Sequence, residues 1–208
     1  MNKLLGIESI LKQKYAIEKL HETVVTSSEY EQILETIEQT LEIKGARIVI
    51  TGVGKNSNLA TKASETFASL GIMSMYVNAG HYAHGDAGFI GDNDVVIHVS
   101  RSGKTEELQA MAMHLKQIKP DVKQILLHCN QELQEKHEEN FDIVLGVPGI
   151  VECDEYQLAP TTSTTVLLVL LDSIAINVSS HLGFTSADFY KYHPGGSLGQ
   201  MLKQSLGS

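Results

Sequence analysis

The spacing of hydrophobic residues changes near residue 46. Before that point, apolar residues recur every three to four positions, which predicts a helix over 3–24. The capping-box pattern Ser28-Glu29-Tyr30-Glu31 then predicts the start of a second helix, whose apolar positions run to Leu41. Both helices precede the first predicted strand and lie outside any strand–helix–strand unit. We therefore expect them to cover a sheet edge or another subunit.

From Ala46 onward, short apolar runs alternate with helical patterns. The runs are rich in β-branched residues and lack alternating polar positions, which is typical of parallel strands buried on both faces. The predicted strands cover 47–51, 73–77, 94–99, 124–128 and 142–146. The predicted helices cover 58–70, 105–118, a short polar stretch at 131–138, and 160–182. This alternation predicts the α/β class, with a parallel sheet and right-handed crossovers.

The stretch from Val95 to Leu108 is the most informative one in the chain. A β-branched run ends at Ser100-Arg-Ser-Gly-Lys-Thr105, and apolar residues resume at helical spacing from Leu108. A strand, a tight Ser/Gly/Thr turn and a helix start together form an anion site, because backbone N–H groups and the helix dipole favour negative charge there. The alternative is an ordinary turn with Ser102 or Thr105 as N-cap. That alternative explains one hydroxyl well, but three around one glycine less well.

A second glycine-rich turn, Gly52-Val-Gly-Lys55, follows the first predicted strand. It is not a dinucleotide fingerprint, because Ser57 stands where a third glycine is needed, and it is not a P-loop, because Asn56 follows Lys55. We interpret it as a backbone loop that passes close to a sugar phosphate, with Lys55 reaching over it. A tight turn with a solvated lysine is the alternative. Carboxyl ends of parallel strands meet at one edge, so both turns and the loop after Val77 are expected there.

Charge and composition limit the kinds of ligand and the cellular compartment that the sequence favours. The chain has 208 residues, which fits one domain, and a net charge of −9, which argues against nucleic acid. An acidic protein must bind phosphate with local donors, so Lys55 and Lys104 near these turns become stronger candidates for phosphate contacts. Lys104 and Arg101 add positive charge at the Ser100–Thr105 turn unless they simply face water. Two cysteines indicate a reducing compartment. We found no leader pattern, and the most apolar run, 166–178, is too short to span a bilayer, so we expect a cytoplasmic protein without membrane contact.

Other polar residues carry open interpretations. His81-Tyr-Ala-His84-Gly-Asp86 is either a metal cluster or, as we favour in the absence of a distant ligand set, a group of polar contacts to substrate. His98, inside an apolar strand, is interpreted as a core residue. Glu107 and Glu152 are candidates for proton shuttling, since a Glu with a raised pKa serves as a general base, although Glu107 also fits a solvated helix face. Cys153 has no evident base and is a poor candidate nucleophile.

Taken together, these segments resemble the sugar isomerase (SIS) domain family, and within it the D-arabinose 5-phosphate isomerases. The matching segments are Gly52-Val-Gly-Lys55, Ala83-His-Gly-Asp86, Ser100-x-Ser-Gly-x-Thr105, Ala159-Pro-Thr-Thr-Ser-Thr-Thr165 and His193-Pro-Gly-Gly-x-Leu-Gly199. The resemblance implies a flavodoxin-like, doubly wound, five-stranded parallel sheet with helices on both faces. It further implies a single SIS domain over 1–208, with its core at 45–202 and a helical segment, 1–44, packed on the domain or on a neighbouring subunit.

The resemblance also implies an activity. It is the reversible conversion of D-ribulose 5-phosphate and D-arabinose 5-phosphate through a cis-enediol, in a homo-tetramer with sites at subunit interfaces. The product supplies Kdo, a sugar acid of lipopolysaccharide and some capsules, and neither a cofactor nor a metal is needed. The rivals are an isomerase of a hexulose or heptose phosphate, and a non-catalytic module that senses a sugar phosphate or nucleotide-linked Kdo. Intact Lys55, Glu152 and His193 argue against a pure sensor.

The roles of individual residues follow from the same resemblance. We assign proton abstraction to Glu152, ring opening and proton transfer between oxygens to His193, charge stabilisation to Lys55, and orientation of Lys55 or a substrate hydroxyl to Glu107. The expected substrate-binding residues are Gly54, Asn56, His84, Ser100, Ser102 and Thr105. Asn56 stands where family members usually have Ser, which puts one contact in doubt. The chain stops at Ser208, where many relatives continue into CBS domains, so we expect either a naturally short form or a cut chain.

Overall fold

A computed structural model describes residues 3–133 and 139–206 of the chain. Its centre is a five-stranded sheet in the order β2-β1-β3-β4-β5, in which every neighbouring pair is parallel. The strands are β1 (Ile48–Gly52), β2 (Ser74–Tyr76), β3 (Val95–Ser100), β4 (Lys123–His128) and β5 (Ile143–Gly146). The order reverses between β1 and β3, so the predicted doubly wound sheet is confirmed, and its switch point lies between these two strands.

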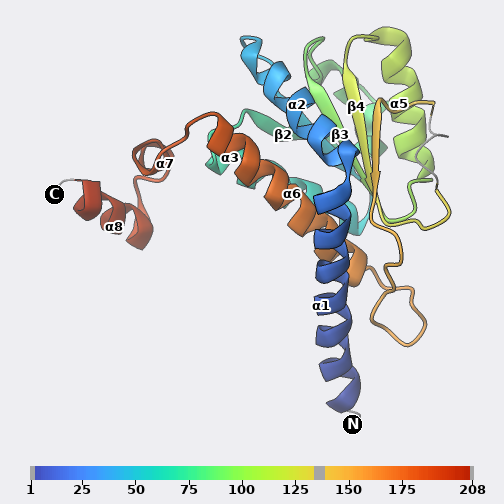
Figure 1. Ribbon diagram of the computed structural model, residues 1–208. Coiled ribbons are helices and arrows are strands. Elements are labelled where there is room, and N and C mark those ends of the chain that lie inside the picture. The colour runs from blue at the N-terminus through green and yellow to red at the C-terminus, as the bar shows by residue number, and fades with distance from the viewer. Residues whose placement is uncertain (1–2, 134–138, 207–208) are drawn as a thin grey trace.

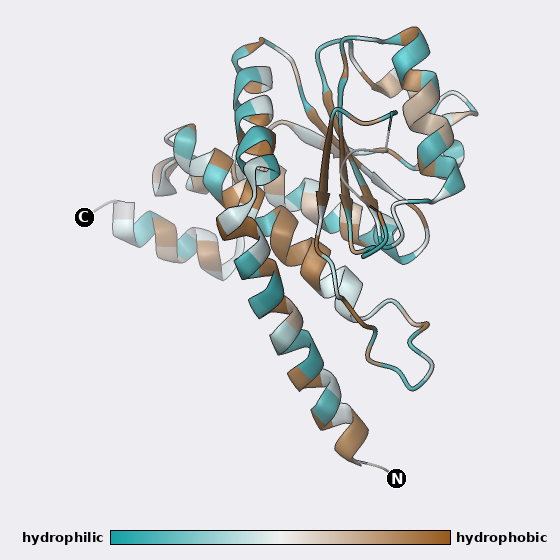
Figure 2. Cartoon of the chain, turned by 45° about the vertical axis from the view of Figure 1, so that its right-hand side comes forward, coloured by the Kyte–Doolittle hydropathy of each residue, from teal (hydrophilic) through white to brown (hydrophobic). Residues whose placement is uncertain are grey.

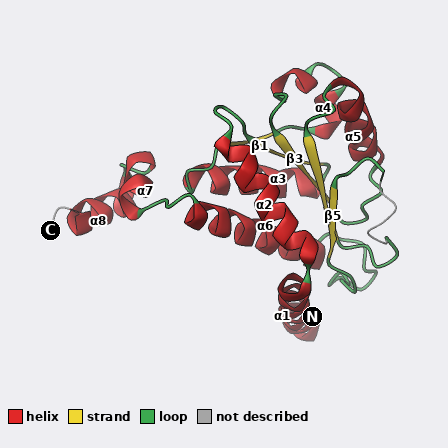
Figure 3. Cartoon of the chain, turned by 45° about the horizontal axis from the view of Figure 1, so that its top comes forward, coloured by secondary structure: helices red, strands yellow, loops and turns green. Residues whose placement is uncertain are grey.

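Helices cover both faces of the sheet (Figures 1 and 3). They are α1 (Lys3–Thr26), α2 (Ser28–Glu42), α3 (Lys55–Ser69), α4 (Ala79–Tyr82), the 3₁₀ turn η1 (Asp86–Phe89), α5 (Glu106–Ile118), α6 (Thr162–His181), α7 (Ser186–Tyr192) and α8 (Gly196–Leu206). Helices α2, α3 and α6 pack on one face, and α4 and α5 pack on the other. The result is a three-layer α/β fold with a core on each side of the sheet.

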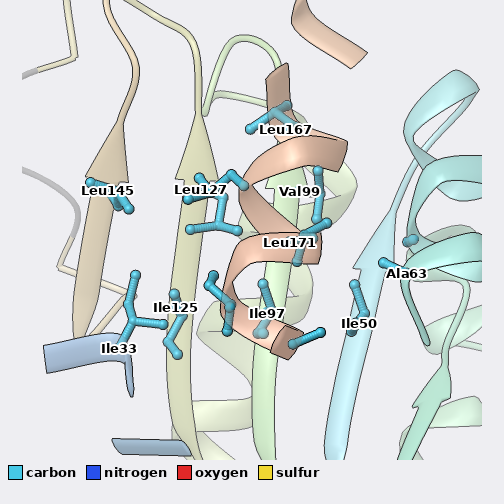
Figure 4. Close-up of a cluster of buried hydrophobic side chains, with 14 of the residues drawn as sticks. Ile33, Ile50, Ala63, Ile97, Val99, Ile125, Leu127, Leu145, Leu167 and Leu171 are labelled. Carbon is cyan, nitrogen blue, oxygen red and sulfur yellow. The ribbon is translucent and has the colours of Figure 1, made fainter. Parts of the chain in front are cut away.

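Along each central strand, alternate side chains pack into the two cores on opposite faces of the sheet. Ile50, Ile97 and Val99 face α6. Leu167 and Leu171 of that helix pack against them in the same core (Figure 4). Val49 and Val96 face α5 in the second core. Each such aliphatic side chain contributes about 1.5–3 kcal/mol by leaving water. Because β1 and β3 are buried on both faces, they read as continuous hydrophobic runs, as the sequence predicted.

Helix α6 is the most apolar helix of the chain. Within residues 3–133 and 139–206, it is the one helix long and apolar enough to cross a membrane by length and composition. Its Leu170, Leu171 and Ile174 are fully buried in the first core, which explains its composition without a bilayer (Figure 2, brown).

Some predicted boundaries are wrong. Helix α2 is capped by Ser27, whose hydroxyl accepts the Tyr30 N–H, rather than by Ser28. Helix α3 begins at Lys55, three residues before its predicted start, directly after the glycine turn. Residues 131–133 form a turn instead of the predicted polar helix, and the rest of that prediction, 134–138, lies outside the described residues.

Two helical segments extend away from the sheet (Figure 1). The C-terminal half of α1 packs on the domain through Ala16 and Leu20, whereas Leu4, Ile7 and Ile10 in its first turns are exposed. At the other end, α7 and α8 form an arm that lies beyond the end of α3. Exposed apolar side chains on a protruding helix are typical of a surface that binds protein.

Candidate active site

The glycine turn after β1 brings backbone and a lysine to the carboxyl edge of the sheet. A Cβ on Gly52 would lie 2.7 Å from the backbone oxygen of Asn56, so only glycine fits this position without displacing the turn. Gly54 has a φ of +62° and occupies the N-cap position of α3. Helix α3 therefore begins at Lys55, whose exposed side chain stands at the helix N-terminus, and the Asn56 side chain is half-buried beside it.

The loop after β3 gathers three hydroxyl groups at the N-terminus of α5. The Ser100 hydroxyl lies 2.8 Å from that of Thr105 and 3.5 Å from that of Ser102. Ser100 also accepts the Gly103 N–H at 3.0 Å, and Ser102 accepts the Lys104 N–H at 3.1 Å. Thr105 occupies the N-cap position, but its side chain makes no capping hydrogen bond. Thr105 is thus the N-cap residue by position, as the alternative expected, but without a side-chain cap, and the hydroxyl cluster is the arrangement expected of an anion site.

Side-chain amides from two other elements fix the backbone of this loop. Gln109, one turn into α5, donates its amide to the Gly103 carbonyl at 2.9 Å. Asn130, which follows β4, donates its amide to the Ser102 carbonyl at 2.9 Å. Both carbonyls are thus already paired with a donor. Sequence reasoning missed Asn130, although its place just after a strand at the same edge was a signal for it.

Glu152 is fully buried in front of helix α6. One carboxylate oxygen accepts the N–H groups of Thr161 and Ser163, at 2.8 and 3.3 Å, and the Thr161 hydroxyl at 3.0 Å. The other accepts the Ser163 hydroxyl and lies 3.0 Å from Arg101 Nε. Burial raises the pKa of this carboxyl, but the hydrogen bonds from Ser163 and Thr161 outweigh burial and leave the pKa below its ordinary value. The expectation of a raised pKa at Glu152 is therefore wrong.

Three further predicted residues lie at the same edge of the sheet. Lys55 and Glu107 occupy the first turns of α3 and α5, which follow the adjacent strands β1 and β3, and Gly52 pairs with Val99 at the strand ends. His84 lies in the short segment between α4 and η1. All three side chains are exposed, and none makes a hydrogen bond or ion pair with the described part of the chain. They are free to contact a ligand.

The structure does not bring His193 to this edge within one chain. His193 caps α7, with Nδ1 3.0 Å from the Phe189 carbonyl and its ring stacked on Phe189 at 4.0 Å. Phe189 shares a hollow with Ser69 and Leu70, at the C-terminal end of α3. Lys55 is at the other end of that helix, 15 residues long and therefore about 22 Å. His193 contacts a site containing Lys55 only if the two residues come from different copies.

The other polar residues considered from the sequence show no arrangement for catalysis or metal binding among the described residues. His98 is fully buried and lies 3.0 Å from the Gln124 amide oxygen, as a core residue does. Cys153 Sγ lies 3.0 Å from the Thr162 hydroxyl and has no base beside it among the described residues. His81, His84 and Asp86 do not form a metal cluster, and no group of three potential ligand side chains is placed to hold a metal within residues 3–133 and 139–206.

A cavity of about 710 Å³ opens beside the hydroxyl cluster. Arg101 and Ser102 line it on one side, Asn130 contributes from the end of β4, and Ile150 and Val151 contribute from the segment after β5. Its size falls within the range typical of small-molecule pockets. The cavity therefore leaves space for a ligand directly beside the Ser100–Thr105 loop.

The family model of the SIS domain matches residues 42–177. The chain belongs to the SIS-domain family. The resemblance stated from the motifs is thereby confirmed, together with the α/β fold of the SIS domain.

Curated relatives of this SIS-domain protein share about a third of its residues. The Escherichia coli arabinose 5-phosphate isomerase KpsF is 33% identical over 195 residues, which is 94% of this chain and 57% of the relative. The Salmonella typhi arabinose 5-phosphate isomerase KdsD is 37% identical over 156 residues, which is 75% of this chain and 46% of the relative. The chain thus spans about half the length of the curated relatives that it matches.

Solved structures agree with the SIS fold along the whole chain. The E. coli CFT073 protein c3406, in complex with arabinose 5-phosphate, superposes with a TM-score of 0.75 at 33% identity, covering 93% of this chain and 100% of that one. A phosphosugar isomerase from Bacteroides fragilis, described as putative and as involved in capsule formation, superposes with a TM-score of 0.79 at 29% identity. The match covers 92% of this chain and 98% of that one.

Proposed function

We propose that this protein is an aldose–ketose isomerase that interconverts D-ribulose 5-phosphate and D-arabinose 5-phosphate. The observation that carries the proposal is the cluster of Ser100, Ser102 and Thr105 hydroxyls at the N-terminus of α5, with Lys55 and Glu107 at adjacent strand ends. The cluster suits a phosphate, and the two charged side chains suit proton transfer beside a carbonyl. The arabinose 5-phosphate complex of c3406 and the names of KpsF and KdsD support the choice of sugar.

The reaction moves protons and leaves the number of electrons unchanged. A base removes a proton from the carbon beside the carbonyl, and the same proton equivalent returns to the neighbouring carbon through a cis-enediol. Lys55 stabilises the negative charge that develops on the enediolate oxygen, because an ammonium at a helix N-terminus adds its charge to the helix dipole. The chemistry requires no redox cofactor. We propose Gly54 and Asn56, the chain neighbours of Lys55, and His84 as further substrate contacts.

We assign the base differently from the sequence-based hypothesis. The Glu152 carboxylate already accepts four hydrogen bonds from Thr161 and Ser163 and pairs with Arg101, and its lowered pKa makes it a weaker base. Glu107 is exposed and makes no hydrogen bond to the described residues. We therefore propose Glu107 as the group that transfers the proton at carbon, and Glu152 as a group that holds the site together.

The proposed active site combines two copies of the chain. His193 opens the aldose ring and moves protons between oxygens, but it lies beyond the far end of α3 in its own chain. We propose that His193 enters the site of a neighbouring copy within a homo-tetramer. The exposed apolar side chains on the first turns of α1, such as Leu4 and Ile10, support assembly. The protein is proposed to act in the cytoplasm and to supply Kdo synthesis for lipopolysaccharide or capsule.

The first experiment is an assay of metal-stripped protein with D-ribulose 5-phosphate, in which D-arabinose 5-phosphate is measured. Prompt formation of D-arabinose 5-phosphate, abolished in Lys55→Ala, supports the proposal and shows that no metal is needed. Turnover of a hexulose or heptose phosphate alone would replace the proposed substrate. Binding of a sugar phosphate or of nucleotide-linked Kdo without turnover of any phosphosugar would favour a sensor module.

A further inference from the structure

Arg101 lies between two hydroxyls of the anion-binding loop but has no assigned role. Its flanking residues, Ser100 and Ser102, belong to the hydroxyl cluster. Its own carbonyl accepts the Cys129 N–H at 3.1 Å, which ties this part of the loop to the end of β4. The position of the Arg101 backbone is therefore fixed by the sheet.

The Arg101 side chain is oriented by a buried charge. Its Nε lies 3.0 Å from Oε1 of Glu152, which is 0% exposed. Glu152 is in turn held by the Thr161 and Ser163 N–H groups at the start of α6. A carboxylate fixed by several donors has a single position, so the ion pair keeps the guanidinium beside this loop.

The rest of the guanidinium remains available. A guanidinium has five N–H donors, and the contact with Glu152 is an ion pair in which Nε lies 3.0 Å from Oε1. Within residues 3–133 and 139–206, the other donors make no hydrogen bond, and the side chain is 46% exposed. It lines the cavity beside Ser102 and Asn130. Because the net charge of the protein is −9, an anion at this edge needs a local cation, and a planar fork of donors matches phosphate geometry.

We propose that Arg101 is a phosphate-binding residue of this site and that Glu152 is the residue that positions it. The guanidinium binds the phosphate of the phosphosugar from the cavity side of the Ser100–Thr105 loop. This inference rests on the proposed function for the identity of the sugar. The binding of phosphate itself does not depend on turnover.

The test compares Arg101→Ala, Arg101→Lys and Lys44→Ala. Lys44 is the control, since it is an exposed lysine that precedes β1, at the opposite edge of the sheet, without an ion pair in the described part of the chain. Inorganic phosphate binding is measured by calorimetry, and KM and kcat are measured with D-ribulose 5-phosphate. We expect Arg101→Ala to weaken phosphate binding and raise KM by at least about tenfold, while kcat changes less than about threefold. Lys44→Ala should change each quantity by less than about threefold.

Arg101→Lys separates geometry from charge. It keeps one positive charge but has no fork of donors, so phosphate binding should fall between that of the wild type and that of Arg101→Ala. It also tests the inference if Arg101→Ala fails to fold, which thermal unfolding reports. Glu152→Gln should weaken phosphate binding several-fold, because it loosens the guanidinium, whereas a Glu152 that acted on the substrate carbon would affect kcat alone.

Two outcomes overturn the inference, and a third separates it from the proposed function. Wild-type phosphate affinity and KM in Arg101→Ala would exclude the role of Arg101 while leaving the isomerase intact. Weaker phosphate binding with an unchanged KM would show that the anion bound by Arg101 is separate from the substrate phosphate. If the wild-type protein binds phosphate through Arg101 but turns over no ribulose phosphate, the proposed function fails and the role of Arg101 in phosphate binding stands.

Discussion

Arg101 and Glu152 form an ion pair that joins the loop after β3 to the start of α6, with Arg101 Nε 3.0 Å from Glu152 Oε1. The carboxylate is fully buried and the guanidinium is half-exposed in a cavity. A buried charge is stabilised here by an arginine that still has donors for a ligand. The same pair therefore bears on the stability of the fold and on the binding of anions.

Glu152→Gln should destabilise the protein in a pH-dependent way. The folded-state pKa of Glu152 is lowered, so its charge adds stability above the unfolded pKa of about 4.5, and this stability is lost as the pH falls through the folded pKa. We expect a loss of about 3 kcal/mol at pH 7, the lower end of the usual cost of breaking a buried ion pair, and a smaller loss below pH 4.5. Urea unfolding of both proteins at pH 7 and near pH 3.5 measures it. An equal difference at both pH values would contradict the prediction.

Two buried histidines should make the wild type less stable in weak acid. Burial lowers the pKa values of His98 and His128 from 6.5 to about 4. Between these values the unfolded chain binds more protons, so stability falls as the pH drops from 6.5 toward 4, by up to about 1.4 kcal/mol per pH unit and histidine. His98→Gln should reduce this slope by about half. An unchanged slope in stability measured against pH would reject the assignment to His98.

Thr105→Val should separate the hydroxyl cluster from helix capping. The Thr105 side chain does not cap α5, so removal of its hydroxyl should change the free energy of unfolding by less than about 1 kcal/mol. Because the hydroxyl lies 2.8 Å from that of Ser100, its loss should weaken inorganic phosphate binding about tenfold. Thr105→Ser keeps the hydroxyl and serves as the control. A large loss of stability with unchanged phosphate binding would restore the capping interpretation.

Gly52→Ala should displace the turn that carries Lys55. The added Cβ would lie 2.7 Å from the Asn56 backbone oxygen, and backbone cannot move aside cheaply. We expect a loss of about 2 kcal/mol in stability and a drop in kcat of at least about tenfold. Gly6→Ala is the control, since nothing lies within 4 Å of a Cβ there. Thermal unfolding measures the loss of stability, and the isomerase assay measures kcat. Wild-type stability and kcat in Gly52→Ala would show that the turn tolerates a side chain.

Two inactive variants should complement each other. If each site takes Lys55 from one copy and His193 from another, a refolded equal mixture of Lys55→Ala and His193→Ala restores intact sites. Random assembly gives about a quarter of the wild-type activity. The mixture is compared with each variant alone at the same concentration. Activity no greater than that of the separate variants would place both residues in the site of one chain.

The sequence by itself determined the α/β class, the five strands and the edge at which the loops meet. Parallel strands buried on both faces favour β-branched residues, as in Val95–Ser100, and the serines and threonine around Gly103 predict a helix start suited to an anion. These features are local, because backbone periodicity and turn chemistry act over a few residues. The predicted family and fold were confirmed for this reason.

Only the tertiary structure decided which distant residues meet. The crossover after β5 brings Glu152 to Arg101, the end of β4 brings Asn130 to the Ser102 carbonyl, and α7 leaves His193 at the far end of α3. The pKa of Glu152 depends on donors that arrive with α6, so spacing predicted a raised value where the fold gives a lowered one. Pairings of this kind depend on how whole helices and strands pack, and local sequence patterns do not predict that packing.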